Sequence, residues 1–398
     1  MTAAYRRREF IGKGIGGAVA LGFGSAFWSG CFDSSDPTRP RGGSGYGPLR
    51  PPDESGIRLP DGFRSRVIAR GEQEVAGTGY RWHRASDGAA TFPVRGGGFV
   101  LVSNSEEPLG GGAAAIRFDR DGEVSDAYRI LEGTYNNCSG GATPWGTWLS
   151  CEEVESGRVW ECDPSGRRVA EPRPAMGVFK HEACAVDPAA KRVYLTEDLI
   201  DGCLYRFTPR HWPDLSEGLL EIATVRRGGG VEWAPVPDPA ARRERTRRQV
   251  PGSTEFKRGE GVWFDSGTLY LATTGDSRLH AYDTRRQRIE VIYDGLRPNT
   301  PLLRVDQLTA SRAGELFICE DLATDEIHLG VMAPDRSITR FLAVTGEEHA
   351  GSELTGAAFD PSGRRLFFSS QRAGTAEPGG LPGPGAIYEV TGPFRGAA

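Results

Sequence analysis

One strand-turn-strand unit recurs along the chain, and this repetition limits the folds open to it. Each unit has a short apolar strand, an Asp, Pro or Gly turn, and a second strand rich in β-branched or aromatic residues. Four units read ACAVDPAAKRVYLT at 183–196, GVWFDSGTLYLATT at 261–274, LTASRAGELFIC at 308–319 and GAAFDPSGRRLFFSS at 356–370. A further hairpin follows each of them, at 203–208, 279–293, 327–342 and 386–391. Repeated four-stranded units are typical of propeller blades.

Two earlier segments fit the same template. The strand GFVLVSN at 98–104 leads to a second strand at 114–118, and the strand at 145–153 continues into 158–163. Six units arranged about a channel predict an all-β fold, a six-bladed β-propeller with a metal site in the central channel. An array of two-sheet sandwiches is the alternative, but it does not explain a sixfold recurrence. The strand-like residues 56–69 are expected to complete the last blade and close the ring.

Composition supports a turn-rich β protein. The chain has 398 residues, of which 55 are Gly and 27 are Pro, and its hydrophobic fraction is 38%. The formal net charge is −5, which argues against a nucleic-acid partner. Beyond the N-terminus, the sequence has no segment apolar enough to span a membrane.

The N-terminus carries an export signature. Arg6-Arg7-Arg8-Glu9-Phe10 precedes a weakly apolar, glycine-rich run from Ile15 to Trp28. A twin arginine before such a run is typical of a bacterial Tat signal. We therefore expect the Tat translocase as a partner during export, and a final location in the periplasm, at the cell surface or outside the cell. Tat substrates cross the membrane folded, often because a metal is loaded first, which favours a metalloprotein.

The expected domain boundaries follow from this signal. Residues 1–31 form the Tat signal peptide, and Trp28-Ser29-Gly30-Cys31 is a possible lipobox that would make Cys31 a lipid anchor. Residues 32–55 are rich in Ser, Gly, Pro and Arg and are predicted to be a disordered linker. Residues 56–398 form the single propeller domain, which we expect to be a monomer.

Cysteine contexts separate one cysteine from the others. Cys151, Cys184 and Cys319 lie in apolar strand segments and are predicted to be buried in the core. Cys162 and Cys203 follow strand or turn segments, and a disulfide between them is open in an exported protein. Cys138 has Asn, Ser and Gly neighbours, which favour a turn. A cysteine in a turn is a candidate metal ligand or nucleophile.

Acidic residues recur at the ends of the repeated strands. They are Glu106/Glu107, Glu152/Glu153, Glu197/Asp198, Asp276 and Glu320/Asp321. Equivalent strand ends of successive blades converge on one face, so these side chains are expected to form a ring of oxygen ligands that suits Ca²⁺. Glu182, Glu260 and Asp306 open three units and would point at the same channel. The thiolate of Cys138 would add a ligand suited to a transition metal such as iron.

Common catalytic motifs are absent from the sequence. It contains no HExxH zinc motif, no GxSxG nucleophile motif, no Walker A loop and no GxGxxG in a βαβ context. The remaining chemistry-bearing pattern is the acidic ring with Cys138.

Several phrases of the sequence resemble the PhoX-type alkaline phosphatases, a family of Tat-exported bacterial enzymes. They are NNCSGGATPWGTWLSCEE at 136–153, KHEACAVDP at 180–188, VYLTEDLIDGCLYRF at 193–207, FKRGEGVWFD at 256–265, VDQLTASRAGELFICED at 305–321 and GAAFDPSGRRLFFSSQ at 356–371. They occur in order over most of residues 95–392.

The resemblance implies an iron and calcium cluster in the channel of a six-bladed propeller. It makes Cys138 an iron ligand and Glu182, Glu260 and Asp306 carboxylate ligands, with Glu152, Glu197 and Asp321 as further ligands. Glu106 has no family match and depends on the ring argument alone. Arg258 matches an arginine that binds the substrate phosphate, a role that suits a guanidinium fork.

Two positions depart from the family pattern. Val154 follows the acidic pair where family members often have Asn, and Val305-Asp306-Gln307 replaces a PDN phrase. The first change would remove a polar contact to phosphate. The chain is also compact for the family, so peripheral insertions that shape substrate choice are expected to be missing.

The sequence therefore predicts a metal-dependent phosphatase that hydrolyses small phosphomonoesters outside the cytoplasm. One alternative is a calcium-dependent propeller lactonase or arylesterase, which would need channel carboxylates but not Cys138. Another is a non-catalytic propeller that binds an envelope component and holds no transition metal.

Overall fold

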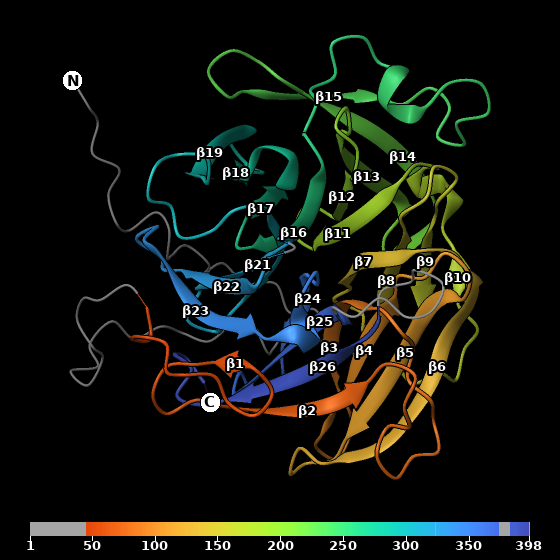
Figure 1. Ribbon diagram of the computed structural model, residues 1–398. Coiled ribbons are helices and arrows are strands. Elements are labelled where there is room, and N and C mark those ends of the chain that lie inside the picture. Colours follow the sequence, from red (N-terminus) through yellow and green to blue (C-terminus); the bar gives the residue numbers. More distant parts are fainter. Residues whose placement is uncertain (1–44, 323, 374–382, 398) are drawn as a thin grey trace.

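Six antiparallel β-sheets surround a central axis as the blades of a propeller (Figure 1). The structure is a computed structural model and describes residues 45–322, 324–373 and 383–397. The innermost strand of each blade contacts the innermost strands of both neighbouring blades. The six-bladed propeller expected from the repeats is confirmed.

The first three blades run from the innermost strand outwards in chain order. The first contains β3 (Ser86–Pro93), β4 (Phe99–Ser105), β5 (Gly111–Phe118) and β6 (Val124–Thr134). The second contains β7 (Asn137–Ala142), β8 (Trp148–Glu152), β9 (Val159–Cys162) and β10 (Glu171–Pro172). The third contains β11 (His181–Asp187), β12 (Arg192–Glu197), β13 (Leu204–His211), β14 (Asp214–Val225) and β15 (Val231–Pro235).

The remaining blades include two strands from the N-terminal part of the domain. The fourth contains β16 (Gly259–Asp265), β17 (Thr268–Thr273), β18 (Arg278–Asp283) and β19 (Arg288–Asp294). The fifth contains β20 (Val305–Ala310), β21 (Leu316–Glu320), β22 (Glu326–Met332), β23 (Ile338–Thr345) and β1 (Ile57–Arg58). The sixth contains β24 (Leu354–Phe359), β25 (Arg365–Ala373), β26 (Gly383–Thr391) and β2 (Arg64–Arg70). Short 3-10 turns are η2 (Pro174–Met176), η3 (Thr246–Arg248), η4 (Thr274–Asp276) and η5 (Glu347–His349).

The ring is closed by the strand β2. It pairs antiparallel with β26 and becomes the outermost strand of the last blade, so the two ends of the domain share one sheet. The prediction that residues 56–69 complete the last blade is confirmed for β2. The earlier strand β1 instead extends the fifth blade, where it pairs with β23.

The hydrophobic core is divided among the interfaces between blades. Each of six buried clusters combines side chains from two neighbouring blades. In the cluster between the sixth and first blades, Phe118 stacks on Phe99 and contacts Phe367. Because alternate side chains of each strand face opposite sides of the sheet, both faces of a blade are apolar and need a neighbour. This pattern explains the apolar strands in every repeat.

Close approach of the innermost strands requires small residues near the axis. A Cβ atom on Gly88 would lie 2.5 Å from Ser139 Cα in the next blade, and one on Gly261 would lie 2.6 Å from Gln307 Cα. Real side chains do not tolerate such distances, so glycine allows neighbouring backbones to meet here. The innermost strands are thereby held close around one narrow channel.

The linker predicted for residues 32–55 lies within the described residues from residue 45 onwards. The Tyr46 ring packs edge-on against Phe63 and Phe341, and its hydroxyl donates a hydrogen bond to Glu315 Oε2 (2.6 Å). The side chain of Tyr46 therefore packs against the domain, whereas most of residues 47–55 are exposed.

The predicted Tat signal and the lipobox at Cys31 lie outside the described residues. Among the residues that the structure describes, no helix has the length and apolar character needed to cross a lipid bilayer.

Buried cysteines behave largely as predicted. Cys151, Cys184 and Cys319 are fully buried in the core, as expected. Cys162 and Cys203 are also buried, but they belong to different clusters and both are free thiols. The open possibility of a disulfide between them is thus excluded.

We expect Phe63→Ala to destabilise the fold strongly, because Phe63 anchors the segment that leads into β2. Its buried ring contacts Phe341 and Phe394 at centroid distances of 5.1 and 4.9 Å. Loss of a buried phenylalanine lowers the free energy of unfolding by about 3–5 kcal/mol. Urea denaturation measures this change. Val169→Ser, at an exposed position, is the control and should leave the transition unchanged; equal stability of both variants would contradict this role.

Candidate functional site

Strand register places two rings of side chains at one end of the channel. The first ring consists of the second residue of each innermost strand: Asp87, Cys138, Glu182, Glu260, Asp306 and Thr355. In each blade, the first residue of the innermost strand pairs with a residue of the second strand. The residue that directly follows this partner belongs to the second ring: Glu106, Glu153, Asp198, Thr274, Asp321 and Gln371. Because these partners pair across the hairpin, the first ring lies two residues deeper than the second.

A bulge in each innermost strand aims the first ring at the axis. The pairing of β7 with β8 shifts register between Asn137 and Gly140, and that of β11 with β12 shifts between His181 and Cys184. Bulges re-aim side chains locally and are common beside functional sites. Cys138 therefore lies in a bulged strand and not in the turn that its Asn, Ser and Gly neighbours indicated.

Both rings contribute to one cavity of about 230 Å³. Its lining residues are Asp87, Glu106, Cys138, Glu153, Glu182, Arg258, Glu260, Arg304, Asp306, Asp321, Glu353 and Arg372. Six of the eight metal ligands expected from the sequence are brought together here: Glu106, Cys138, Glu182, Glu260, Asp306 and Asp321. Arg258, the expected phosphate-binding residue, lines the same cavity.

Glu152 and Glu197 face away from this cavity. The carboxylate of Glu152 accepts hydrogen bonds from Arg158 N (3.1 Å) and Trp160 Nε1 (3.0 Å). The carboxylate of Glu197 is paired with Arg247 (2.9 Å) and the Tyr205 hydroxyl (2.8 Å). Each is the last residue of its strand, and consecutive side chains point to opposite sides.

Glu153 and Asp198, which directly follow Glu152 and Glu197, lie at the channel instead. Glu153 lines the cavity, and Asp198 bonds to Arg258, which also lines it. Asp276, a member of the expected ring, instead pairs with Arg278 outside the cavity. In the second and third blades the first acid of the pair is the last residue of the strand. In the first blade the strand ends at Ser105, so the first acid, Glu106, already lies beyond the strand end and faces the channel.

Four lining residues were not singled out from the sequence. Asp87 carries a signal, because SDGAA at 86–90 aligns with HEACA at 181–185 once the innermost strands are superposed. Glu353 precedes β24, and Arg304 precedes β20. Arg372 lies near the end of β25. Arg304 carries a signal too, because it lies two residues before Asp306, as Lys180 and Arg258 lie two residues before Glu182 and Glu260. Glu353 and Arg372 follow no such pattern, so no sequence signal marks them.

The cavity offers three overlapping groups of ligand atoms. They are Asp87 with Glu106 and Cys138, Cys138 with Glu153 and Glu182, and Glu182 with Glu260 and Asp306. Within each group the ligand atoms lie within 4.8 Å of one another. Glu182 Oε2 and Asp306 Oδ1 are buried without a hydrogen-bond partner among the described residues. Orphaned carboxylate oxygens of this kind fit a cation.

Crowding of acids alters the pKa values of the first ring. Burial and the neighbouring Glu106 raise the pKa of Asp87 to about 7. Burial, followed by the charges of Glu153 and Asp306, raises the pKa of Glu182 well above its usual value. Burial and nearby carboxylates likewise raise the pKa of the Cys138 thiol. A bound cation would favour the charged forms and reverse these shifts.

Lysine and arginine side chains pair mainly with carboxylates of the second ring. Arg258 pairs with Asp198 (2.7 Å), Glu260 (2.9 Å) and Asp321 (3.2 Å). Lys180 bridges Glu153 (2.7 Å) and Asp198 (3.0 Å).

The other two arginines act in the same way. Arg372 bridges Glu106 (2.9 Å) and Glu353 (2.7 Å), and Arg304 pairs with Asp321. The three guanidinium groups therefore lie beside the second ring, where each is paired with carboxylates of the cavity.

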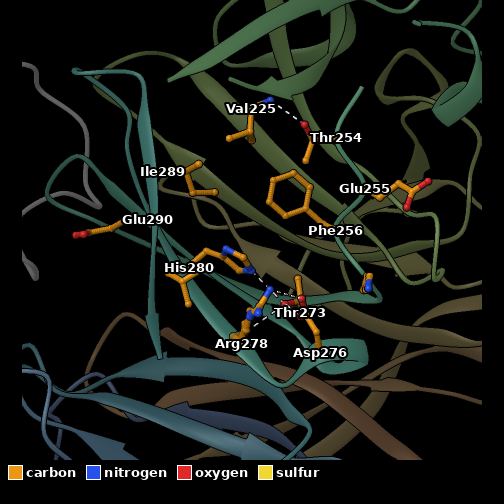
Figure 2. Close-up of a pocket in the computed structure, with 12 residues that line it drawn as sticks. Val225, Thr254, Glu255, Phe256, Thr273, Asp276, Arg278, His280, Ile289 and Glu290 are labelled. Carbon is orange, nitrogen blue, oxygen red and sulfur yellow. Dashed lines mark hydrogen bonds and ion pairs between the residues drawn. The ribbon is translucent and has the colours of Figure 1, made fainter. Parts of the chain in front are cut away.

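A second cavity, of about 250 Å³, lies beside the fourth blade (Figure 2). Its lining combines apolar residues such as Phe256 and Ile289 with charged groups, of which Asp276, Arg278 and Glu290 are already paired. Arg278 pairs with Asp276 (3.1 Å), and His280 Nε2 lies 3.1 Å from Thr273 Oγ1. The central cavity is slightly smaller, but its unpartnered buried carboxylates make it the candidate functional site.

The fold and the site define a β-propeller with an acidic, thiol-containing channel, and comparisons with known proteins point to one family. The family model described as alkaline phosphatase PhoX matches residues 101–293. The resemblance to the PhoX-type phosphatases is thereby confirmed, and this match supports a phosphatase. Among curated protein sequences, none matches the chain.

Solved structures agree on the fold. Pseudomonas fluorescens PhoX in complex with vanadate, a transition state analogue, has a TM-score of 0.73 and 18% identity, covering 89% of this chain and 99% of that one. A gluconolactonase from Xanthomonas campestris has a TM-score of 0.51 and 16% identity, covering 87% of this chain and 98% of that one. At these identities the likenesses support the propeller fold alone.

We predict that Glu153→Gln weakens cation binding, whereas Glu152→Gln does not. Glu153 belongs to a group of ligand atoms in the cavity, while Glu152 binds backbone and indole N–H groups outside it. The affinity for Ca²⁺, measured by calorimetric titration of EDTA-stripped protein, should fall at least about tenfold in Glu153→Gln. The isosteric Glu152→Gln controls for the neighbouring position. Equal losses in both variants would contradict the register.

The metal-free protein should become less stable as the pH rises. An unfolded aspartate titrates at about 4, whereas Asp87 in the folded state has a pKa of about 7. The folded state therefore binds more protons between these values, and raising the pH removes stability. Scanning calorimetry in EDTA should show an unfolding midpoint that falls from about pH 5 to about pH 8. Added Ca²⁺ should reduce this fall; a midpoint that rises over the range would contradict the assignment.

Proposed function

We propose that the protein is a metal-dependent phosphatase that hydrolyses phosphomonoesters outside the cytoplasm. The observation that carries the proposal is the cavity, in which eight carboxyl groups and Cys138 are gathered beside three arginines. Without cations, this excess of acid would repel a phosphate dianion. With cations bound, the same cavity becomes a phosphate site. The family match over residues 101–293 supports this reaction.

The residues present fit an iron and calcium centre. Cys138 supplies the thiolate that favours a transition metal such as iron, and the carboxylates supply the hard oxygens that calcium prefers. Cys138 and Glu182 each belong to two groups of ligand atoms, so each would help to hold the ions of both groups. When bound, such ions offset the charge of the phosphate and activate water for attack on phosphorus.

The chain's own cations would bind and orient the phosphate group. Arg258 reaches over the cavity from a backbone position fixed by its N–H, which donates to Leu199 O (2.8 Å). Its guanidinium fork, with those of Arg304 and Arg372, suits the paired oxygens of a phosphate. Lys180 holds Glu153 and Asp198 together at the cavity wall. These groups would position the ester for in-line attack.

Export and partners belong to the same proposal. The Tat signal in residues 1–31 supports transport in the folded state, with the ions already bound. The partners would be small phosphate esters and, during export, the Tat translocase, and Cys31 would carry a lipid anchor if the lipobox is used. The protein would act as a monomer, because one chain closes the ring and encloses the cavity.

A calcium-dependent lactonase is the second candidate. The likeness to a gluconolactonase fold favours it, and such an enzyme would use the channel carboxylates without needing Cys138. The two candidates differ in their metals, since only the phosphatase proposal calls for iron.

We predict that the exported, metal-loaded protein hydrolyses p-nitrophenyl phosphate and contains both iron and calcium. Elemental analysis and the release of p-nitrophenol measure the two properties. Arg258→Lys keeps the charge but loses the guanidinium fork, so kcat/KM should fall by about 10²–10³, the usual loss for one preorganised donor. Arg168→Lys, whose side chain is 71% exposed, is the matched control.

Separate outcomes would overturn separate parts of the proposal. A protein with iron and calcium bound but no turnover of the phosphate ester would refute the phosphatase. A colourless protein that contains calcium alone and opens lactones would favour the second candidate. No bound transition metal and no turnover of either substrate would favour a binding propeller.

A further inference from the structure

Five large exposed apolar side chains lie in loops at the end of the propeller that carries the cavity. Among the described residues, those in loops at this end are Leu109, Tyr135, Ile200, Leu296 and Leu303. Each lies in a loop that leaves a second strand or enters an innermost strand. Because strands alternate in direction, both kinds of loop lie at the end where the two rings stand.

Three of these residues lie in loops that hydrogen-bond to a cavity residue or to its neighbour in the sequence, and we call them the apolar collar: Tyr135, Ile200 and Leu303. Tyr135 N donates to Glu152 Oε1 (3.2 Å), directly before the cavity residue Glu153. Leu303 N donates to Glu320 Oε1 (2.7 Å) and directly precedes Arg304.

The loop of Ile200 is bonded to Arg258, which lines the cavity. Its neighbour Leu199 accepts the backbone hydrogen bond of Arg258. Ile200 itself is 62% exposed. Two collar residues thus lie beside arginines that line the cavity: Leu303 directly precedes Arg304, and Ile200 follows Leu199, which accepts the bond from Arg258.

Exposed apolar residues elsewhere on the described surface lie in different settings. Leu219 and Val291 are within the outer strands β14 and β19, and Val169 lies in the connection from β9 to β10, at the opposite end of its blade. Single exposed apolar residues are ordinary. Their grouping around a charged cavity is what indicates a ligand.

We propose that the apolar collar binds the alcohol portion of the substrate, so that the enzyme prefers phosphomonoesters of aromatic or extended apolar alcohols. This inference rests on the proposed phosphatase function. The cavity of about 230 Å³ is lined almost wholly by charged groups, so the phosphate end enters it. The ester oxygen then faces the mouth, and the alcohol lies among the collar residues, where apolar contact removes surface from water.

Charged side chains divide the collar and favour a small ligand over a flat partner. Arg304, whose side chain is 43% exposed, directly follows Leu303, and Lys180, 26% exposed, stands at the cavity wall near Glu153. A protein or membrane partner would need a continuous apolar patch. A single aryl or alkyl group needs only the few contacts that the collar offers.

The test compares two substrates and two sets of variants in the full-length, metal-loaded protein. The collar variant is Tyr135→Ser with Ile200→Ser and Leu303→Ser, and the control variant is Leu219→Ser with Val169→Ser. We expect kcat/KM for 1-naphthyl phosphate to fall about tenfold in the collar variant, and that for glycerol 3-phosphate to change by less than about twofold. The control variant should match the native protein on both esters, and inhibition by orthophosphate should be the same in all three proteins.

The possible results separate this inference from the function on which it rests. Equal losses for both esters, or no loss for 1-naphthyl phosphate, would overturn the collar as an alcohol site while the phosphatase stands. No turnover of either ester by the native protein would refute the phosphatase and the collar with it. Flotation of the native protein with lipid vesicles, or a dimer in sedimentation, that is lost only in the collar variant would overturn it in favour of a lipid surface or a second copy.

Discussion

Repulsion among buried carboxylates at the propeller axis is the constraint on which the rest of the site depends. Eight carboxyl groups line one cavity of about 230 Å³. The bulged innermost strands aim one side chain at the axis in every blade, so the acids cannot turn away without changing register. The cavity must therefore be neutralised by protons, by fixed cations or by metal ions, and the fold must hold the groups in place meanwhile.

The propeller resists this repulsion through its interfaces. Six apolar clusters join each blade to the next, and β2 closes the ring by hydrogen bonding to β26. Movement of one ring residue would require a whole blade to move against two packed neighbours. Polar side chains add local support, since Gln307 and Gln371 both donate hydrogen bonds to Asp87. The site is consequently preorganised both by the apolar packing between blades and by the hydrogen bonds of its own residues.

The sequence was sufficient for the fold because each repeat carries its own information. Apolar alternation and turn residues mark every hairpin, and their recurrence specifies blades. The candidate site was harder to predict, because moving along a strand by one residue changes which face of the sheet a side chain lies on. Glu152 and Glu153 are adjacent and chemically alike, yet only the strand end determines which of them faces the channel. Asp87 is flanked by Ser and Gly, as in a turn, so its match to Glu182 is recognised only once β3 is aligned with β11. Arg372 follows no repeat, so only the three-dimensional arrangement reveals its position.

The two rings divide the charge between them. Lys180, Arg258, Arg304 and Arg372 all pair with second-ring or neighbouring carboxylates, nearer the mouth. Deeper in the first ring, the thiol of Cys138 bonds to another acid, Glu182 (3.2 Å), while Glu182 Oε2 and Asp306 Oδ1 have no partner among the described residues. Metal ions would therefore gain most beside Glu182 and Asp306, which form no ion pair with a lysine or arginine among the described residues. An anionic ligand would then meet metal charge below and guanidinium groups around the mouth, which is the polarity that phosphate binding requires.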